Sequence, residues 1–243
     1  MMRLPVIQGL IRRRLLVNFR VDPAVVQQLL PKPFQPKRHA GFAIVGVCLI
    51  RLEQIRPSGL PALFGFASEN AAHRIAVSWK DQRGSKLEGV YIPRRDTGSR
   101  ISHLAGGRIF PGEHHLANFA VRDEDGEIEF RMVSRDQTVK VELRGRETDQ
   151  FPKDSCFASL AEASTFFESG SLGFSVTRDP TRLDGIELRT SSWKVHPLAV
   201  EQVSSSFLAD PKRFPNGSAV FDHTLLMRDL PHEWHGAEDL CCS

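Results

Sequence analysis

The sequence predicts a mostly β protein of the α+β class, with an antiparallel sheet and two or three short helices. Three observations support this fold class. Short apolar or alternating segments recur along the chain, with turn residues between them. Signals for helix starts are few, and the pair Asp125-Gly126 is typical of a β-hairpin. Many short strands at this spacing favour a barrel or a sandwich.

The N-terminal part of the chain alternates predicted strands with turns, beginning with a strand at residues 15–21. Asp22 and Pro23 supply an N-cap and a proline at the first helical position, so a helix is expected from here to about Leu30. Residues 41–50, GFAIVGVCLI, form a continuous apolar run, which predicts a strand buried on both faces. Its glycines predict a bend or a close approach of another backbone. Further strands are expected at residues 72–79 and 89–93, and a short helix or turn at residues 99–105.

The C-terminal part continues this pattern. Apolar and charged residues alternate over residues 139–144, as in a half-buried strand. Ser159 followed three residues later by Glu162 is a capping-box pattern, which predicts a helix over residues 160–168 that ends at Gly170. Other strands are expected at residues 115–121, 174–178, 186–189, 193–196 and 199–207, and a last strand or short helix at residues 220–227.

The composition is that of an ordinary globular protein, with 41% hydrophobic and 25% charged residues. We expect a single domain over residues 1–243, with a loosely held tail at about 236–243. The net charge is +3, and the densest basic cluster, at residues 12–14, is short. Nucleic-acid-binding proteins concentrate more positive charge on one face, so no nucleic-acid partner is predicted.

Cysteine use and hydropathy predict a cytoplasmic protein without a membrane partner. The spacing of Cys48, Cys156, Cys241 and Cys242 matches neither a zinc site nor a disulfide framework, which fits reduced thiols. No apolar run approaches the roughly 20 residues of a membrane-spanning helix. The N-terminal basic residues follow the apolar ones, the reverse of signal-peptide order. A homo-oligomer is compatible with the sequence.

Three segments in the middle of the chain resemble a known family. The segments SENAAHRIAV, GVYIPRRDT and GGRIFPG are similar to those of the uncharacterised bacterial YqjF-like family of the acetoacetate decarboxylase-like superfamily. The resemblance covers about residues 12–145 and extends more loosely over residues 204–234. It implies a β-rich fold with a cone-shaped antiparallel barrel that contains a ligand pocket.

The resemblance carries over residue by residue to Glu69, Arg74, Arg108 and Pro111. In the decarboxylases, a lysine shortly after a similar Gly-Arg segment forms a Schiff base with the substrate. Here residues 111–115 read PGEHH and contain no lysine. Because a Schiff base needs a primary amine, the resemblance implies the fold but not the decarboxylase reaction.

We therefore expect a small organic acid to bind in the pocket, held by Arg108, Arg74 and Glu69. Glu69 and Arg74 are alternatively an ordinary ion pair, and Arg108 a clamp on backbone carbonyls. Two other functions stay open: a lyase or hydrolase that works without a Schiff base, and a structural or partner-binding protein with a filled barrel. Candidate catalytic residues are Glu69, His115, Lys194 and His196.

Neither a metal nor a cofactor is predicted. His114 and His115 are adjacent in a predicted strand, so their side chains point to opposite faces. His232 and His235 lack the spacing of the zincin motif. His223, like His196, is interpreted as a structural histidine, with a role as pocket base as the alternative. The apolar run around Cys48 suggests an inert core thiol.

Overall fold

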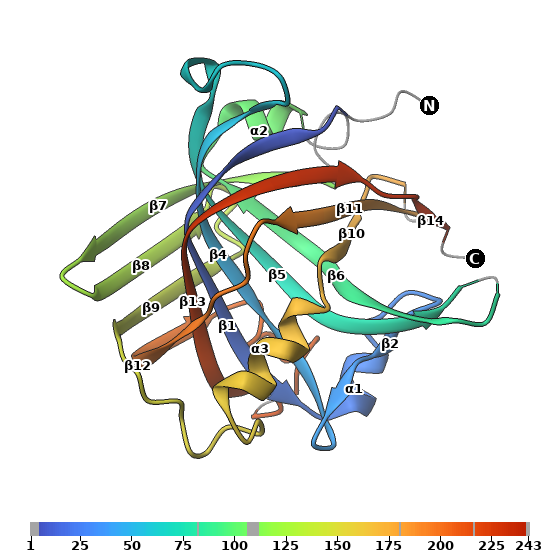
Figure 1. The fold of residues 1–243 in the computed structure, drawn as a ribbon. Coiled ribbons are helices and arrows are strands. Elements are labelled where there is room, and N and C mark those ends of the chain that lie inside the picture. Colours follow the sequence, from blue (N-terminus) through green and yellow to red (C-terminus); the bar gives the residue numbers. More distant parts are fainter. Residues whose placement is uncertain (1–4, 82, 106–111, 180, 216, 242–243) are drawn as a thin grey trace.

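A computed structural model describes residues 5–81, 83–105, 112–179, 181–215 and 217–241. In this part of the chain, one 14-stranded sheet is accompanied by three α-helices (Figure 1). The strands are β1 (Ile7–Val21), β2 (Gln35–Pro36), β3 (Arg38–His39), β4 (Phe42–Pro57), β5 (Phe66–Lys80), β6 (Lys86–Thr97), β7 (His114–Glu124), β8 (Glu127–Ser134), β9 (Lys140–Glu147), β10 (Leu172–Val176), β11 (Arg182–Thr190), β12 (His196–Ser205), β13 (Val220–Gly236) and β14 (Leu240–Cys241). The helices are α1 (Pro23–Gln27), α2 (Arg100–Ala105), α3 (Leu160–Glu168) and a 3-10 turn, η1 (Ala62–Phe64). None of the described helices is long and apolar enough to span a membrane.

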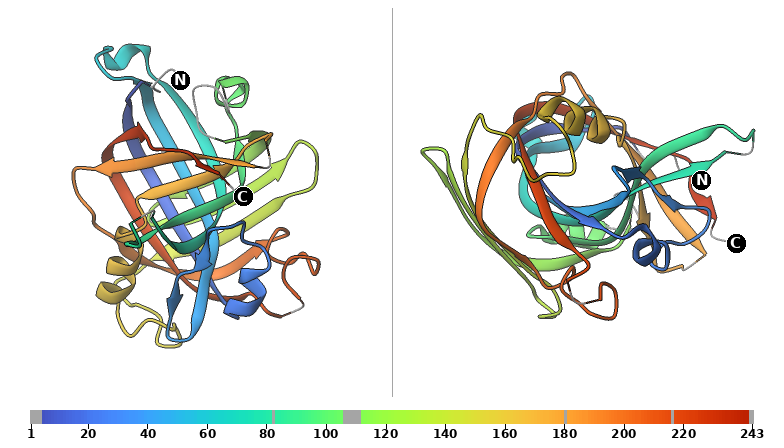
Figure 2. Two further views of the ribbon diagram at one scale, coloured as in Figure 1. Left: turned by 90° about the vertical axis from the view of Figure 1, so that its right-hand side faces the viewer. Right: turned by 90° about the horizontal axis from the view of Figure 1, so that it is seen from below.

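The sheet follows the order β14-β11-β10-β6-β7-β8-β9-β12-β13-β1-β4-β5-β2, with β3 paired to β4. Two further pairings, β11 with β13 and β5 with β6, join strands that lie far apart on this path. The strands consequently curve around a common centre (Figure 2). This arrangement confirms the mostly β prediction.

The prediction of a wholly antiparallel sheet is corrected by strand β6. One edge of β6 pairs antiparallel with β5, and the other edge pairs parallel with both β7 and β10. The other pairings among the described strands are antiparallel. Parallel neighbours need a connection of about a dozen residues or more. Residues 98–113, which include α2, provide that length between β6 and β7. The sequence pattern does not specify which strands such a connection brings together.

Local signals placed several elements correctly. Asp22 accepts a 2.7 Å hydrogen bond from the backbone N–H of Ala24 and begins α1. Ser159 Oγ accepts the Glu162 N–H and begins α3, whose bounds agree with the prediction. Asp125 and Gly126 have φ of 52° and 77°, the left-handed pair that a tight hairpin between β7 and β8 requires.

Two C-terminal segments differ from expectation. The strand predicted at 193–196 begins only at His196, because Trp193 instead packs toward α3 and donates a 2.9 Å hydrogen bond from Nε1 to Ser164. Within the tail that was expected to be loosely held, Leu240 and Cys241 form strand β14 against β11. An ion pair of 2.5 Å between Arg182 and Asp239 adds to this contact.

The sheet has an apolar core on each face. The larger core includes Val17, Val47 and Phe130. On the other face, α3 buries Ala163 and Phe167 against residues of β1, β4, β5 and β13 (Figure 1). The cavity described below opens on this second face, since Cys48 and Leu52 belong to both.

Strand β4 confirms the prediction of burial on both faces, and Gly46 confirms the close approach. A Cβ atom at Gly46 would lie 2.1 Å from the Val17 carbonyl oxygen of β1. Backbone atoms in a paired strand cannot move away as a flexible side chain can. Gly46→Ala is therefore expected to destabilise the protein by about 2–3 kcal/mol, the upper range for overpacking, as measured by urea unfolding.

Gly98→Ala is the matched control for this substitution. Its added Cβ would lie 3.3 Å from the Phe119 side chain, and the nearest backbone atom, the Glu69 carbonyl oxygen, would be at an ordinary contact distance of 3.6 Å. We expect a loss below about 1 kcal/mol. Equal losses for the two variants would contradict the assignment of strain to the β1–β4 backbone contact.

Candidate ligand-binding site

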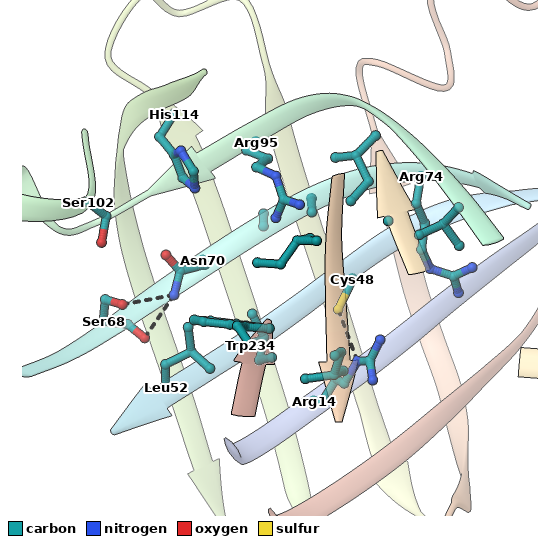
Figure 3. A pocket seen from close by; sticks show the side chains of 18 of the residues that line it. Arg14, Cys48, Leu52, Ser68, Asn70, Arg74, Arg95, Ser102, His114 and Trp234 are labelled. Carbon is teal, nitrogen blue, oxygen red and sulfur yellow. Dashed lines mark hydrogen bonds between the residues drawn. The ribbon is translucent and has the colours of Figure 1, made fainter. Parts of the chain in front are cut away.

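A cavity of about 140 Å³ lies on the α3 face of the sheet. One wall is formed by β1, β4, β5 and β6, and the other by β10, β11 and Trp234 of β13 (Figure 3). On β5 the side chains of Ser68, Asn70, Ala72 and Arg74 line it, as expected for alternate residues of one strand. Most of the remaining wall is aliphatic.

Three guanidinium groups line this cavity: those of Arg14, Arg74 and Arg95 (Figure 3). Arg14 Nη1 and Arg74 Nε are buried and have no hydrogen-bond partner among the described residues. Asp96 is the one carboxylate among the described lining residues, and Arg94 binds it through Nε and Nη2 at 2.9–3.2 Å. The positive charge of the cavity is thus not neutralised by its own lining.

The site remains cationic at neutral pH. Burial lowers the pKa of Arg74 to about 10, and the nearby charge of Arg14 contributes. Burial also lowers the pKa of Arg95 to about 10. Buried like charges repel one another and lack solvation by water. A bound anion would relieve both penalties, so this geometry favours an anionic ligand.

Arg74 is held by a buried hydrogen-bonded series of side chains. It donates from Nη2 to Asn18 Oδ1. Because a guanidinium can only donate, the Asn18 amide must turn its NH₂ group away, toward Leu16 O and His223 Nε2, each 3.0 Å distant. His223 therefore accepts at Nε2 and donates from Nδ1 to Asp222 at 2.6 Å. This direction of donors fixes His223 as a neutral imidazole.

Asp222 anchors the far end of this series. It accepts from Ser155 Oγ at 2.6 Å, the Cys156 N–H at 2.9 Å and Arg20 at 3.0 Å, in addition to His223. Burial alone would raise its pKa, but the hydrogen bonds hold the pKa of Asp222 well below its usual range. Burial lowers the pKa of His223, partly offset by Asp222. A charged Asp222 and a neutral His223 both agree with the direction of the hydrogen bonds.

The structure separates the two predicted ligand residues on β5. Arg74 lines the cavity, whereas Glu69, an odd number of residues away, lies on the other face. Glu69 pairs with Arg13 at 2.8 Å, and Arg13 also contacts Asp123. The ordinary ion pair considered for Glu69 is therefore present, with Arg13 in place of Arg74.

The other candidates lie outside the cavity or outside the described chain. His115 does not line the cavity, although its neighbour His114 does. Lys194 and His196 are exposed. Arg108 lies outside the described residues, so its predicted role in ligand binding stays a prediction.

Sequence reasoning missed Arg14, Arg95 and Asn70 as cavity residues. Arg14 sits within IRRRLLV and Arg95 within YIPRRDT, so each looked like one charge among several. These residues could have been found from the sequence as polar side chains that share one face of a largely apolar strand, because such a face lines a core or a cavity. Asn70 follows this rule, and it donates to Ser68 Oγ at 2.9 Å and accepts from Thr97 at 2.8 Å.

The chemistry offered by the described lining is limited. Burial, with the charge of Arg95, lowers the pKa of His114 to about 3, which makes it a weak base. The carboxylate of Asp96 is engaged by Arg94. No described lining residue is a lysine. The arrangement is suited to holding an anion rather than to moving protons.

The family comparison agrees with the resemblance found in the sequence. The chain matches, over residues 10–226, a family of uncharacterized conserved proteins called DUF2071. This chain belongs to the DUF2071 family. No curated protein matches the DUF2071 chain in sequence.

Solved structures show that the DUF2071 chain has the acetoacetate decarboxylase-like fold. It is similar to an acetoacetate decarboxylase-like enzyme from Sphingomonas wittichii, with a TM-score of 0.63 and 14% identity over 100% of this chain and 95% of that one. It is also similar to the acetoacetate decarboxylase of Legionella pneumophila, with a TM-score of 0.59 and 14% identity over 97% of this chain and 88% of that one. For the enduracididine biosynthesis enzyme MppR, complexed with pyruvate, the TM-score is 0.57 and the identity 11%, over 100% of this chain and 92% of that one.

Proposed function

We propose that this DUF2071 protein binds a small organic acid in the cavity, with the carboxylate held by Arg74 together with Arg14 or Arg95. The observation that carries the proposal is the buried cavity lined by three guanidiniums, two of which keep buried nitrogens without a partner in the described chain. A guanidinium binds a carboxylate through two parallel hydrogen bonds, which gives both strength and orientation. Arg108 stays in this proposal as a further anion-binding residue.

The dimensions of the cavity support a small ligand. Its volume of about 140 Å³ is roughly ten times the space that one water molecule needs. An acid of a few carbon atoms fits this size. The pyruvate complex of MppR shows that one protein of similar fold holds a ligand of this class. We also propose that the β5–β6 and β11–β13 pairings close the sheet into the cone-shaped barrel that surrounds this ligand.

Binding is favoured over the alternatives for specific reasons. A filled barrel is not supported, because a cavity with charged walls is present. A lyase or hydrolase without a Schiff base needs a titratable group of suitable pKa at the ligand. His114, with a pKa of about 3, is poorly matched to that task at neutral pH.

The test is a thermal-shift series with pyruvate, lactate and acetate. An acid that binds only the folded state at 100 times its dissociation constant should stabilise it by about 2.7 kcal/mol. Arg74→Gln should weaken binding of each acid by roughly tenfold or more, because charge-assisted hydrogen bonds are lost. Arg131→Gln, which removes an exposed arginine paired with Glu142, is the matched control and should bind as the wild type does.

The measured quantity is the ligand-induced shift, because Arg74→Gln also loses its bond to Asn18 and changes the stability of the free protein. If no carboxylate stabilises the wild type, the proposed function is wrong. If Arg74→Gln and Arg131→Gln respond to the acids equally, Arg74 is not the anion-binding residue.

A further inference from the structure

Cys48 places a thiol inside the cationic cavity. The apolar run around it suggested an inert core residue, and it is buried, but it belongs to the cavity lining. Its sulfur accepts a 3.4 Å hydrogen bond from Arg14 Nε (Figure 3). It also interacts electrostatically with Arg74 and Arg95. Reactive cysteines are typically found in such electropositive surroundings.

Arg74 gives an independent indication that the cavity holding this sulfur binds an anion. Its side chain is buried, with 5% exposure, and its Nε has no partner within the described chain. Arg14 likewise uses Nε for the sulfur and leaves Nη1 without a partner. Nε and Nη1 belong to one guanidinium group, so an acid bound to Arg14 would share this group with the Cys48 sulfur.

We propose that Cys48 captures the bound acid covalently and that the acid carries an electrophilic carbon next to its carboxylate, as a 2-oxo acid does. This inference rests on the proposed function of the cavity. A carboxylate held by Arg14 and Arg74 positions its neighbouring carbonyl carbon at the sulfur. Proximity of this kind converts a weak bimolecular addition into an intramolecular one.

The addition balances without another reactant. The sulfur attacks the carbonyl carbon, so a C–S bond forms and the C–O π bond breaks. The electron pair of that π bond moves to the oxygen, which also receives the thiol proton. The product is a hemithioketal, and no oxidant or reductant is consumed. Guanidinium N–H groups stabilise the negative charge that develops on the oxygen.

Cys156 provides an internal comparison. Its backbone N–H donates to Asp222, and it does not line the cavity. Burial and the charge of Asp222 raise the pKa of its thiol to about 12. Cys156 therefore stays a protonated thiol and is not expected to form the adduct.

The direct test is ¹³C NMR of the full chain with pyruvate labelled at C2. We expect a bound resonance in the region of a tetrahedral carbon bonded to oxygen and sulfur. Cys48→Ser should lose this resonance, and Cys156→Ser should keep it. A bound pyruvate that keeps only its carbonyl resonance, or an adduct that survives in Cys48→Ser, would overturn the inference.

Pyruvate and lactate separate this inference from the function on which it rests. Both carry a carboxylate, but only pyruvate has a carbonyl carbon at C2. In the wild type, pyruvate should bind at least about tenfold more tightly than lactate, and in Cys48→Ser the two should bind equally. Equal binding in the wild type means that the cavity holds acids without covalent capture. Absence of binding by either acid contradicts the proposed function as well.

Discussion

Asp222→Ala is expected to destabilise the protein by about 3–5 kcal/mol, the effect of removing one partner from a buried ion pair. The carboxylate is fully buried and accepts hydrogen bonds from His223, Ser155, the Cys156 N–H and Arg20. Truncation leaves the Nδ1 proton of His223, the hydroxyl of Ser155 and the Cys156 N–H without this acceptor, whereas Arg20 keeps the carbonyl oxygen of Asp154. Urea unfolding at neutral pH measures the loss.

The same substitution should also weaken ligand binding, although Asp222 does not line the cavity. Without Asp222, His223 is no longer held with its Nδ1 proton pointing away from Asn18. Asn18 can then turn its amide, and Arg74 loses its fixed acceptor. Asp222 is thus a positioning residue, and the ligand-induced thermal shift should fall with the stability.

Glu129→Ala is the control, because Glu129 also pairs with an arginine, Arg122, but is exposed. Its loss should stay below about 1 kcal/mol, and ligand binding should be unchanged. Asp222→Asn keeps the shape and one acceptor oxygen, so it separates packing from charge. If Asp222→Asn and Asp222→Ala both leave acid binding intact, the series from Asp222 to Arg74 has no role in positioning.

Helices and turns that are fixed by neighbouring residues could be predicted from the sequence. Helix α3 has its bounds fixed by Ser159 and Glu162 at one end and by a glycine beyond the other. The β7–β8 hairpin follows from Asp125-Gly126, the residue pair that tolerates positive φ. The parallel pairs of β6 could not be predicted, since they depend on contacts between segments distant in sequence.

In the site, too, some residues could be predicted from the local sequence and others depend on contacts between distant segments. Arg74 was identified through the family resemblance, and it does line the cavity. Glu69 came from the same segment, but the alternation of side chains along β5 turns it to the opposite face. Arg14 and Arg95 reach the cavity only because β1 and β6 flank the β4–β5 pair. That neighbourhood is a property of the sheet order, which local sequence does not encode.

Acidification from pH 6.5 to 5 is expected to lower the free energy of unfolding, by up to about 4 kcal/mol through His73 and His232 alone. The cause is two neutral buried histidines, His73 and His232, which are 0% and 3% exposed. Burial lowers the pKa of His73 to about 3 and that of His232 to about 4, and nearby arginine charges contribute. Each such histidine lowers the free energy of unfolding by about 1.4 kcal/mol for every pH unit of acidification between pH 6.5 and its pKa in the folded protein.

The sign follows from proton binding. Below pH 6.5 the unfolded chain protonates these imidazoles, whereas the folded chain does not, so protons stabilise the unfolded state. The stability is fully present above pH 6.5 and is lost as the pH falls toward 4. Glu69 acts in the opposite direction, because burial raises the pKa of its carboxyl group. His114 and His223 act in the same direction as His73 and His232, because burial lowers their pKa too.

Urea unfolding at intervals between pH 7 and 5 measures this slope. His73→Phe loses the hydrogen bond to Ser205 and is less stable at every pH, but its slope should be smaller by about 1.4 kcal/mol per pH unit. His196→Asn replaces an exposed imidazole and should keep the wild-type slope. A wild-type slope near zero, or one that His73→Phe leaves unchanged, would show that His73 is protonated in the folded protein.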